Sequence, residues 1–190
     1  MRGRVAERVT ACNCGPVIRR CCRRRCSTAF SVPPTWRARD GEVSGLSGSD
    51  LASIRTAATA LSPWAHIATV GRDGHPDVVP VHPCWEGDAI WIMIGNDSVK
   101  AKNVRHNNHV ALHWQVTEKG DGVEIWGTAS LHSDPETKRR LWTGVFDYDL
   151  DLFAPGGPDN SPDTGFMRVD PYRALHLPAY GMGGRFEWRA

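Results

Sequence analysis

The segment Ala65–Trp114 reads AHIATVGRDGHPDVVPVHPCWEGDAIWIMIGNDSVKAKNVRHNNHVALHW. Its first half holds short apolar runs separated by the sequences Arg72–His75 and Glu86–Asp88. Asp-Gly and Gly-Asp between apolar runs are typical of β-hairpins. We therefore predict a meander of three strands, at Ala65–Val70, Asp77–His82 and Ala89–Ile94.

A strand-to-helix junction follows, with the sequence GNDSVKAKN at Gly95–Asn103. The pattern predicts a short helix at Ser98–His106, entered through Asp97 or Ser98. A helix N-terminus offers free backbone N–H groups and the positive end of a dipole. With the Ser98 hydroxyl and the Lys100 and Lys102 ammonium groups, it could bind a phosphate. A capped surface helix with solvated lysines explains the same spacing equally well.

Outside this segment the chain alternates further strands with helices. Ser49 or Asp50 can cap a helix that runs to Leu61, and Pro63 stops it. Asp134-Pro135 begins a second helix, which we expect to end near Phe146. The dense Asp, Gly and Pro content of 147–163 predicts a loop. Further strands are expected at Val110–Val116, Val123–Leu131, Gly165–Val169 and Tyr172–Leu177, and a last one at Arg185–Trp188.

These elements predict a mainly β protein. Six or seven antiparallel strands, flanked by two or three helices, form a sheet that removes its edges by closing into a barrel. The expected domain covers residues 49–190. Residues 1–48 form an Arg- and Cys-rich leader without apolar periodicity, which we expect to be disordered. Cys12, Cys14, Cys21, Cys22 and Cys26 leave a zinc or nucleic-acid element as the alternative for it.

Charge and cysteine content narrow the function classes. Residues 1–40 hold ten Arg against two acidic residues, whereas the other 150 residues hold 13 basic and 19 acidic ones. The domain is thus mildly acidic, which argues against nucleic-acid binding except through the leader. Cys84 is the one cysteine of the domain, as expected of a reduced, cytoplasmic protein. No apolar run is long enough to predict a membrane span.

Four motifs in fixed order resemble the pyridoxamine 5′-phosphate oxidase-related family, in its general-stress-protein-like branch. They are Ala68-Thr69-Val70-x-x-Asp73-Gly74-x-Pro76, Val78-Val79-Pro80-Val81, Ser98-x-Lys100-x-x-Asn103 and Asn107-Asn108-x-Val110-Ala111-Leu112. The resemblance is specific over residues 49–132 and weaker beyond. It implies an FMN-binding split β-barrel that forms a homodimer, with the flavin at the subunit interface.

By position, the resemblance assigns cofactor-binding roles to twelve residues. Ser98 and Lys100 would hold the FMN phosphate, and Lys102 and Asn103 fit the same helix start. The strand residues would lie against or beside the isoalloxazine ring, and Trp188 matches a tryptophan near the family's C-terminus. The strand residues are Val78, Val79, Pro80, Val81, His82, Met93 and Ile94.

Two departures argue against a vitamin B6 oxidase. That enzyme has Arg at the start of its second strand and Lys at its end, where this chain has Asp77 and His82. Its C-terminal Arg-x-His pattern is also missing. Some relatives bind the deazaflavin coenzyme F-420 instead of FMN, and the sequence leaves that alternative open.

Other residues of chemical interest have simpler explanations. His106, His109 and His113 would not share one face, because the helix ends near Asn107. Cys84 is expected to be a small buried hydrophobe, and the alternating aspartates of 147–151 a solvated loop. Trp85, Trp91, Trp114, Trp126 and Trp142 could line an aromatic ligand or a dimer interface, although core packing explains them as well. We therefore predict no catalytic side chain and no metal site.

The expected function is an FMN-dependent oxidoreductase that acts on a small molecule, in which the cofactor carries the chemistry. The first alternative is a flavin, deazaflavin or haem carrier or sensor without turnover. The second is a cofactor-free protein whose leader binds nucleic acid.

Overall fold

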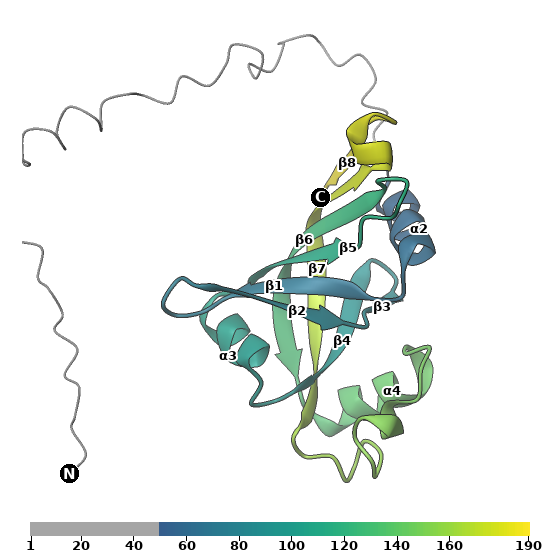
Figure 1. Cartoon of the computed structure of the whole chain (residues 1–190). Coiled ribbons are helices and arrows are strands. Elements are labelled where there is room, and N and C mark those ends of the chain that lie inside the picture. The colour runs from purple at the N-terminus through teal and green to yellow at the C-terminus, as the bar shows by residue number, and fades with distance from the viewer. Residues whose placement is uncertain (1–49) are drawn as a thin grey trace, which may run out of the picture. The chain divides into compact units, whose positions relative to one another are not determined.

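The structure of the protein, a computed structural model, describes residues 50–190, which form a mainly β domain (Figure 1). The leader at 1–48 lies outside the described residues. The three described α-helices are α2 (Leu51–Leu61), α3 (Val99–His106) and α4 (Pro135–Gly144). The described strands are β1 (Ala65–Val70), β2 (Pro76–Val81), β3 (Cys84–Glu86), β4 (Ala89–Gly95), β5 (His109–Trp114), β6 (Gly122–His132), β7 (Thr164–Leu177) and β8 (Phe186–Arg189).

Eight strands form one antiparallel sheet in the order β2-β1-β5-β6-β7-β4-β3, and β8 pairs with β7. The two end strands, β2 and β3, are consecutive in the chain, and only His82 and Pro83 connect them. Consecutive Cα atoms lie about 3.8 Å apart, so this link spans at most roughly 11 Å. The two edges of the sheet must therefore approach each other, which curls it into the predicted split barrel. His82 lies where the barrel closes.

Strand β7 corrects one detail of the prediction. Two strands were expected at Gly165–Val169 and Tyr172–Leu177, yet Thr164–Leu177 forms one strand of 14 residues. Its register with the partner strand β6 shifts between Trp126 and Gly127, which pair with Arg173 and Pro171, so Tyr172 is an extra residue on β7. A bulge of this kind absorbs the hydrogen bond that proline cannot donate.

Gly127 makes this bulge possible. A Cβ atom at Gly127 would lie 2.5 Å from Val169 Cγ1 and 2.8 Å from the Asp170 carbonyl oxygen. A side chain there would collide with β7, so the close approach of the two strands requires glycine. Strand β3 was not predicted either, because three residues beside a turn carry almost no periodic signal. Its pairing with β4 makes it a strand.

The helix starts agree with the sequence prediction. The side chains of Asp50, Ser98 and Asp134 accept hydrogen bonds from backbone N–H groups of α2, α3 and α4, respectively. Helix α2 packs against β6 and β7, and α3 packs against β1 and β6. Helix α4 ends at Gly144, two residues before the expected end. None of the described helices combines the length and the apolar character that crossing a bilayer requires.

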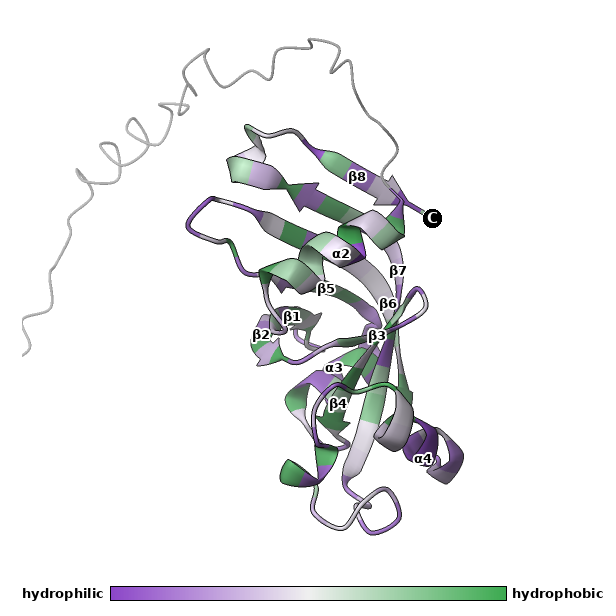
Figure 2. Cartoon of the chain, turned by 90° about the vertical axis from the view of Figure 1, so that its right-hand side faces the viewer, coloured by the Kyte–Doolittle hydropathy of each residue, from purple (hydrophilic) through white to green (hydrophobic). Residues whose placement is uncertain are grey.

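The buried side chains form two clusters. The larger one fills the barrel with residues of α2, α3 and every strand from β1 to β7 except β3, such as Ile67, Ile92 and Ile125. The smaller one, made of Trp91, Leu141, Leu150 and Phe166, joins α4 and its following loop to the sheet. Helix α4 is otherwise mainly hydrophilic (Figure 2). The smaller cluster thus holds the loop that follows α4 against the sheet.

Candidate functional site

A cavity of about 410 Å³ gathers six of the residues that were predicted to bind the cofactor. They come from the end of β2, from β4 and from the first turn of α3, so three separate elements build its wall. These six are Pro80, Val81, His82, Met93, Ile94 and Lys100, and the wall is completed by Trp64, Gly95, Tyr148, Phe153, Asp163 and Thr164.

The cavity has a polar end and an aromatic end. Lys100 and Asp163 contribute one basic and one acidic group to the wall, and Gly95 and Thr164, which are paired between β4 and β7, also line it. At the aromatic end, the His82 ring stacks on Tyr148 with the centroids 4.2 Å apart, and it lies 4.8 Å from the Trp64 ring. This arrangement suits a ligand with a flat ring and an anionic group.

Three predicted strand residues do not line this cavity. Val78 is largely exposed on the edge strand β2, whereas Val79 packs half-buried against the barrel core. Both residues come earlier on β2 than Pro80 and Val81, where the strand reaches the cavity. Trp188 lies on β8 opposite Ala174 and packs against the barrel core.

Three predicted helix residues also lie outside the cavity wall. The Ser98 hydroxyl oxygen accepts the Ala101 N–H at 3.3 Å, as an N-cap does. Lys102 is exposed, and buried Asn103 donates its Nδ2 hydrogen to Thr69 Oγ1 at 3.0 Å. Asn103 thus joins α3 to β1. Of the helix residues named in advance, only Lys100 reaches the cavity.

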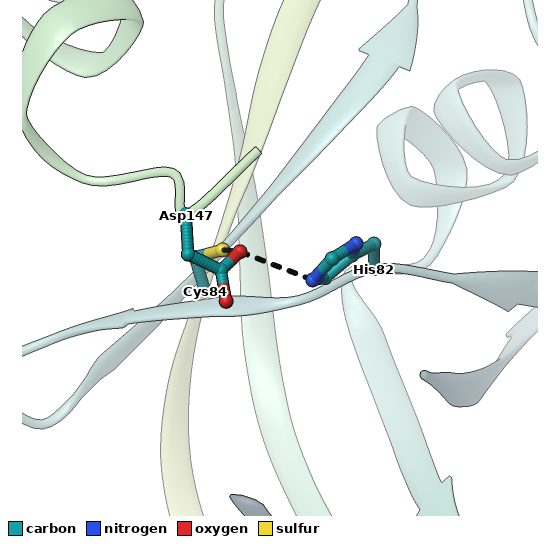
Figure 3. Close-up of side chains that lie close together, drawn as sticks. All are labelled: His82, Cys84 and Asp147. Carbon is teal, nitrogen blue, oxygen red and sulfur yellow. Dashed lines mark hydrogen bonds and ion pairs between the residues drawn. The ribbon is translucent and has the colours of Figure 1, made fainter. Parts of the chain in front are cut away.

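A second cavity, of about 400 Å³, is lined by a cluster of three side chains that the sequence did not single out together. His82 Nε2 lies 3.1 Å from Asp147 Oδ1, and the Cys84 thiol donates to the same oxygen at 3.3 Å (Figure 3). His82 lies in the β2–β3 link and Cys84 begins β3, whereas Asp147 comes from the loop after α4. His82 lines both cavities.

The order of these groups differs from that of a nucleophilic triad. In such a triad the histidine stands between the nucleophile and the acid, whereas here the Asp147 carboxylate stands between the other two. Burial raises the pKa of the Cys84 thiol to about 12, and the Asp147 charge adds to this. A thiol that stays protonated is a poor nucleophile, so the cluster does not activate Cys84.

Tyr148 responds to the same surroundings. Burial raises the pKa of its phenol, and the neighbouring Cys84 and Asp147 add to the rise. Tyr148 therefore stays neutral and presents a flat, uncharged ring to the cavity and to His82.

The Nε2 atom of His82 is a buried polar atom without a hydrogen bond. This nitrogen is shielded from solvent and makes no hydrogen bond, because the nearby Asp147 oxygen lies within ion-pair distance but outside hydrogen-bond geometry. Buried polar atoms are nearly always satisfied, so an unsatisfied one calls for an explanation. The sequence shows that His82 and Cys84 are only two positions apart. Asp147, more than 60 residues later, could not be connected to it by spacing.

Comparison with known proteins identifies the family. A family model described as pyridoxamine 5′-phosphate oxidase matches residues 56–175. The chain belongs to this family. No curated protein matches the chain.

Solved structures of the family share its fold. A general stress protein 26-related protein of Clostridium acetobutylicum superposes with a TM-score of 0.61 at 18% identity, covering 74% of this chain and 96% of that one. General stress protein 26 of Bacillus anthracis gives a TM-score of 0.57 at 18% identity, covering 74% and 98%. An FMN-binding, pyridoxamine 5′-phosphate oxidase-related protein of Nostoc punctiforme gives 0.57 at 17% identity, covering 75% and 91%. These similarities confirm the predicted split-barrel fold.

Proposed function

We propose that the protein binds FMN in the cavity beside Lys100 and acts as a flavin-dependent oxidoreductase on a small molecule. One observation carries the proposal: residues of β2, β4 and α3 that were assigned to the cofactor beforehand line a single cavity. The Nostoc punctiforme protein of the same fold is described as FMN binding, which supports the choice of flavin.

The cavity fits the parts of FMN. Its volume of about 410 Å³ lies in the range of small-ligand sites, roughly 300–1,000 Å³. The Lys100 ammonium group at the start of α3 suits the phosphate, as does the N-terminal end of the helix dipole. Ser98 uses its oxygen as the helix cap, so its hydroxyl hydrogen remains free to donate to an anion.

The protein's own part in the reaction would be binding and positioning. FMN, when bound, supplies hydride or electron transfer. Met93 and Ile94, which line the cavity, would exclude water from the ring, and Lys100 would hold the anionic group. His82, which contacts the rings of Trp64 and Tyr148, would orient a substrate at the aromatic end.

We also propose that a second copy of the chain completes this cavity. Trp64 and Phe153, which line it, are 53% and 64% exposed, and Val78 on the adjacent edge strand is 60% exposed. Large exposed apolar side chains around an opening are typical of an interface. We expect a homodimer, with its single described cysteine, Cys84, free in the reducing cytoplasm.

The absorbance spectrum of the purified protein tests the cofactor assignment. We expect a yellow protein that releases FMN on denaturation. A deazaflavin or haem spectrum, or a colourless protein that takes up no FMN, would contradict the proposal.

Turnover separates an enzyme from a carrier. We expect NAD(P)H to bleach the flavin band, and an added electron acceptor to restore it repeatedly. A flavin that no donor reduces would favour the carrier instead.

A further inference from the structure

Three potential metal ligands converge at the closure of the barrel. His82 also lines the cavity proposed for FMN, called the flavin seat below, whereas Cys84 and Asp147 line only the second cavity. His82 Nε2, Cys84 Sγ and a carboxylate oxygen of Asp147 all lie within 4.8 Å of one another (Figure 3). Imidazole nitrogen, thiolate sulfur and carboxylate oxygen are the donors that zinc takes in proteins.

Two of the three distances between these atoms resemble those of a tetrahedral site, and the third, between the nitrogen and the sulfur, is within 4.8 Å. Zinc bonds of about 2.0–2.3 Å place neighbouring ligand atoms roughly 3.3–3.6 Å apart. Here the nitrogen and sulfur lie 3.1 Å and 3.3 Å from the Asp147 oxygen. Asp147 is 69% exposed on a loop, so a small outward shift of its carboxylate makes room for an ion.

The unsatisfied nitrogen points to the same conclusion. His82 Nε2 is buried without a hydrogen bond, and a metal ion would use its lone pair. An ion pair between His82 and Asp147 explains why Nε2 and Oδ1 lie close together. It does not explain why Nε2 makes no hydrogen bond. A metal ion accounts for all three side chains at once.

The cluster is accessible from the second cavity. All three side chains line that cavity of about 400 Å³, which leaves room for a fourth ligand. Three protein ligands with an open position are the composition of catalytic rather than structural zinc sites.

We propose that His82, Cys84 and Asp147 bind one zinc-like divalent ion, whose fourth position faces the second cavity. Binding displaces the thiol proton of Cys84 to solvent, because the thiolate is the ligand. Since His82 lines both cavities, the ion would lie in the wall that separates the flavin seat from the second cavity.

A zinc titration of the full-length chain tests the proposal. Cys12, Cys14, Cys21, Cys22 and Cys26 are first replaced by serine, so that the leader offers no thiol. The protein is stripped with a chelator and titrated with Zn²⁺ against a chromophoric competitor. We expect about one equivalent to bind. Absence of tight binding would overturn the proposal.

Single substitutions identify the ligands. Asp147→Asn and Cys84→Ser should each weaken Zn²⁺ binding by more than about tenfold. Asp149→Asn is the matched control on the same loop, because asparagine preserves its cap of the Asp151 N–H, and it should change nothing. Equal affinity in Asp147→Asn and Asp149→Asn would overturn the proposal.

Cobalt gives a readout that does not depend on affinity. Co²⁺ bound to thiolate produces a charge-transfer absorbance, which we expect in the leader-serine protein and in Asp149→Asn but not after Cys84→Ser. A band that survives Cys84→Ser would contradict the proposed ligand set. FMN uptake, measured on the metal-free protein, keeps this test separate from that of the flavin seat.

Discussion

The two cavities that share His82 differ in how the chain builds them. The flavin seat is made mainly of segments that lie close in sequence, from the end of β2 to the start of α3, and it combines apolar strand residues with one lysine. The second cavity brings the β2–β3 link together with α2 and with the loop after α4, and it carries the polar cluster of His82, Cys84 and Asp147. A single histidine thus belongs to two sites of different chemistry.

This difference shows what each site depends on. The flavin seat needs the hairpin meander and the helix start, which local sequence encodes, and it also takes Tyr148 and Phe153 from the loop after α4. The polar cluster needs the smaller hydrophobic cluster around Leu141, because that cluster holds the loop that carries Asp147. Substitutions at the two sites should therefore differ in their effects on FMN binding, stability and thiol reactivity.

The largest effect concerns the reactivity of Cys84. Its pKa of about 12, compared with an ordinary 9.0, should make alkylation near pH 7.5 roughly 1,000-fold slower than in the unfolded chain. Iodoacetamide labelling of the metal-free, leader-serine protein, followed by mass spectrometry, measures this rate. The rate should rise about tenfold per pH unit up to about pH 11. A plateau below pH 9 would reveal an activated thiolate and make the second cavity a nucleophilic site.

The next effect concerns the support of the polar cluster. Leu141 is fully buried in the smaller hydrophobic cluster, so Leu141→Ala should lower the free energy of unfolding by about 2–5 kcal/mol. Leu152→Ala, at an exposed position of the same region, should change it by less than about 0.5 kcal/mol. Urea unfolding followed by tryptophan fluorescence compares the two. Similar losses would mean that the cluster does not hold this loop.

A smaller effect tests the polar end of the flavin seat. Lys100→Ala should weaken FMN binding by at least about tenfold, since hydrogen bonds to charged groups contribute roughly 1.5–3 kcal/mol. Lys102→Ala removes the same charge from an exposed position outside the cavity, so it should weaken binding far less. Fluorescence titration with FMN measures both. Equal losses of FMN affinity in the two variants would show a general effect of positive charge rather than a specific contact of Lys100 with the phosphate.

The smallest effect tests the independence of the two cavities. Asp147→Asn should change FMN affinity by less than about fivefold, because Asp147 does not line the flavin seat and its side chain is 69% exposed. The same fluorescence titration, on metal-free protein, gives the value. A loss as large as that of Lys100→Ala would mean that the Asp147–His82 pair is part of the flavin seat.

The fold could be predicted where the sequence carries a local period or a capping residue. The hairpin turns and the caps at Asp50, Ser98 and Asp134 are visible in this way, and the structure follows them. The prediction failed where pairing overrides local preference. Strand β7 continues through Pro171 because a bulge at Tyr172 shifts its register with β6, and β3 exists only because β4 pairs with it.

The sequence by itself determined the meander, the helix starts and the position of Lys100 after a strand, because each depends on residues a few positions apart. Tertiary structure decided which of these residues share a cavity, and it turned Val78 and Lys102 to the surface and Asn103 toward Thr69. It also decided the cluster of His82, Cys84 and Asp147. The reason is physical: barrel closure and the packing around Leu141 bring distant segments together, and no spacing along the chain encodes those contacts.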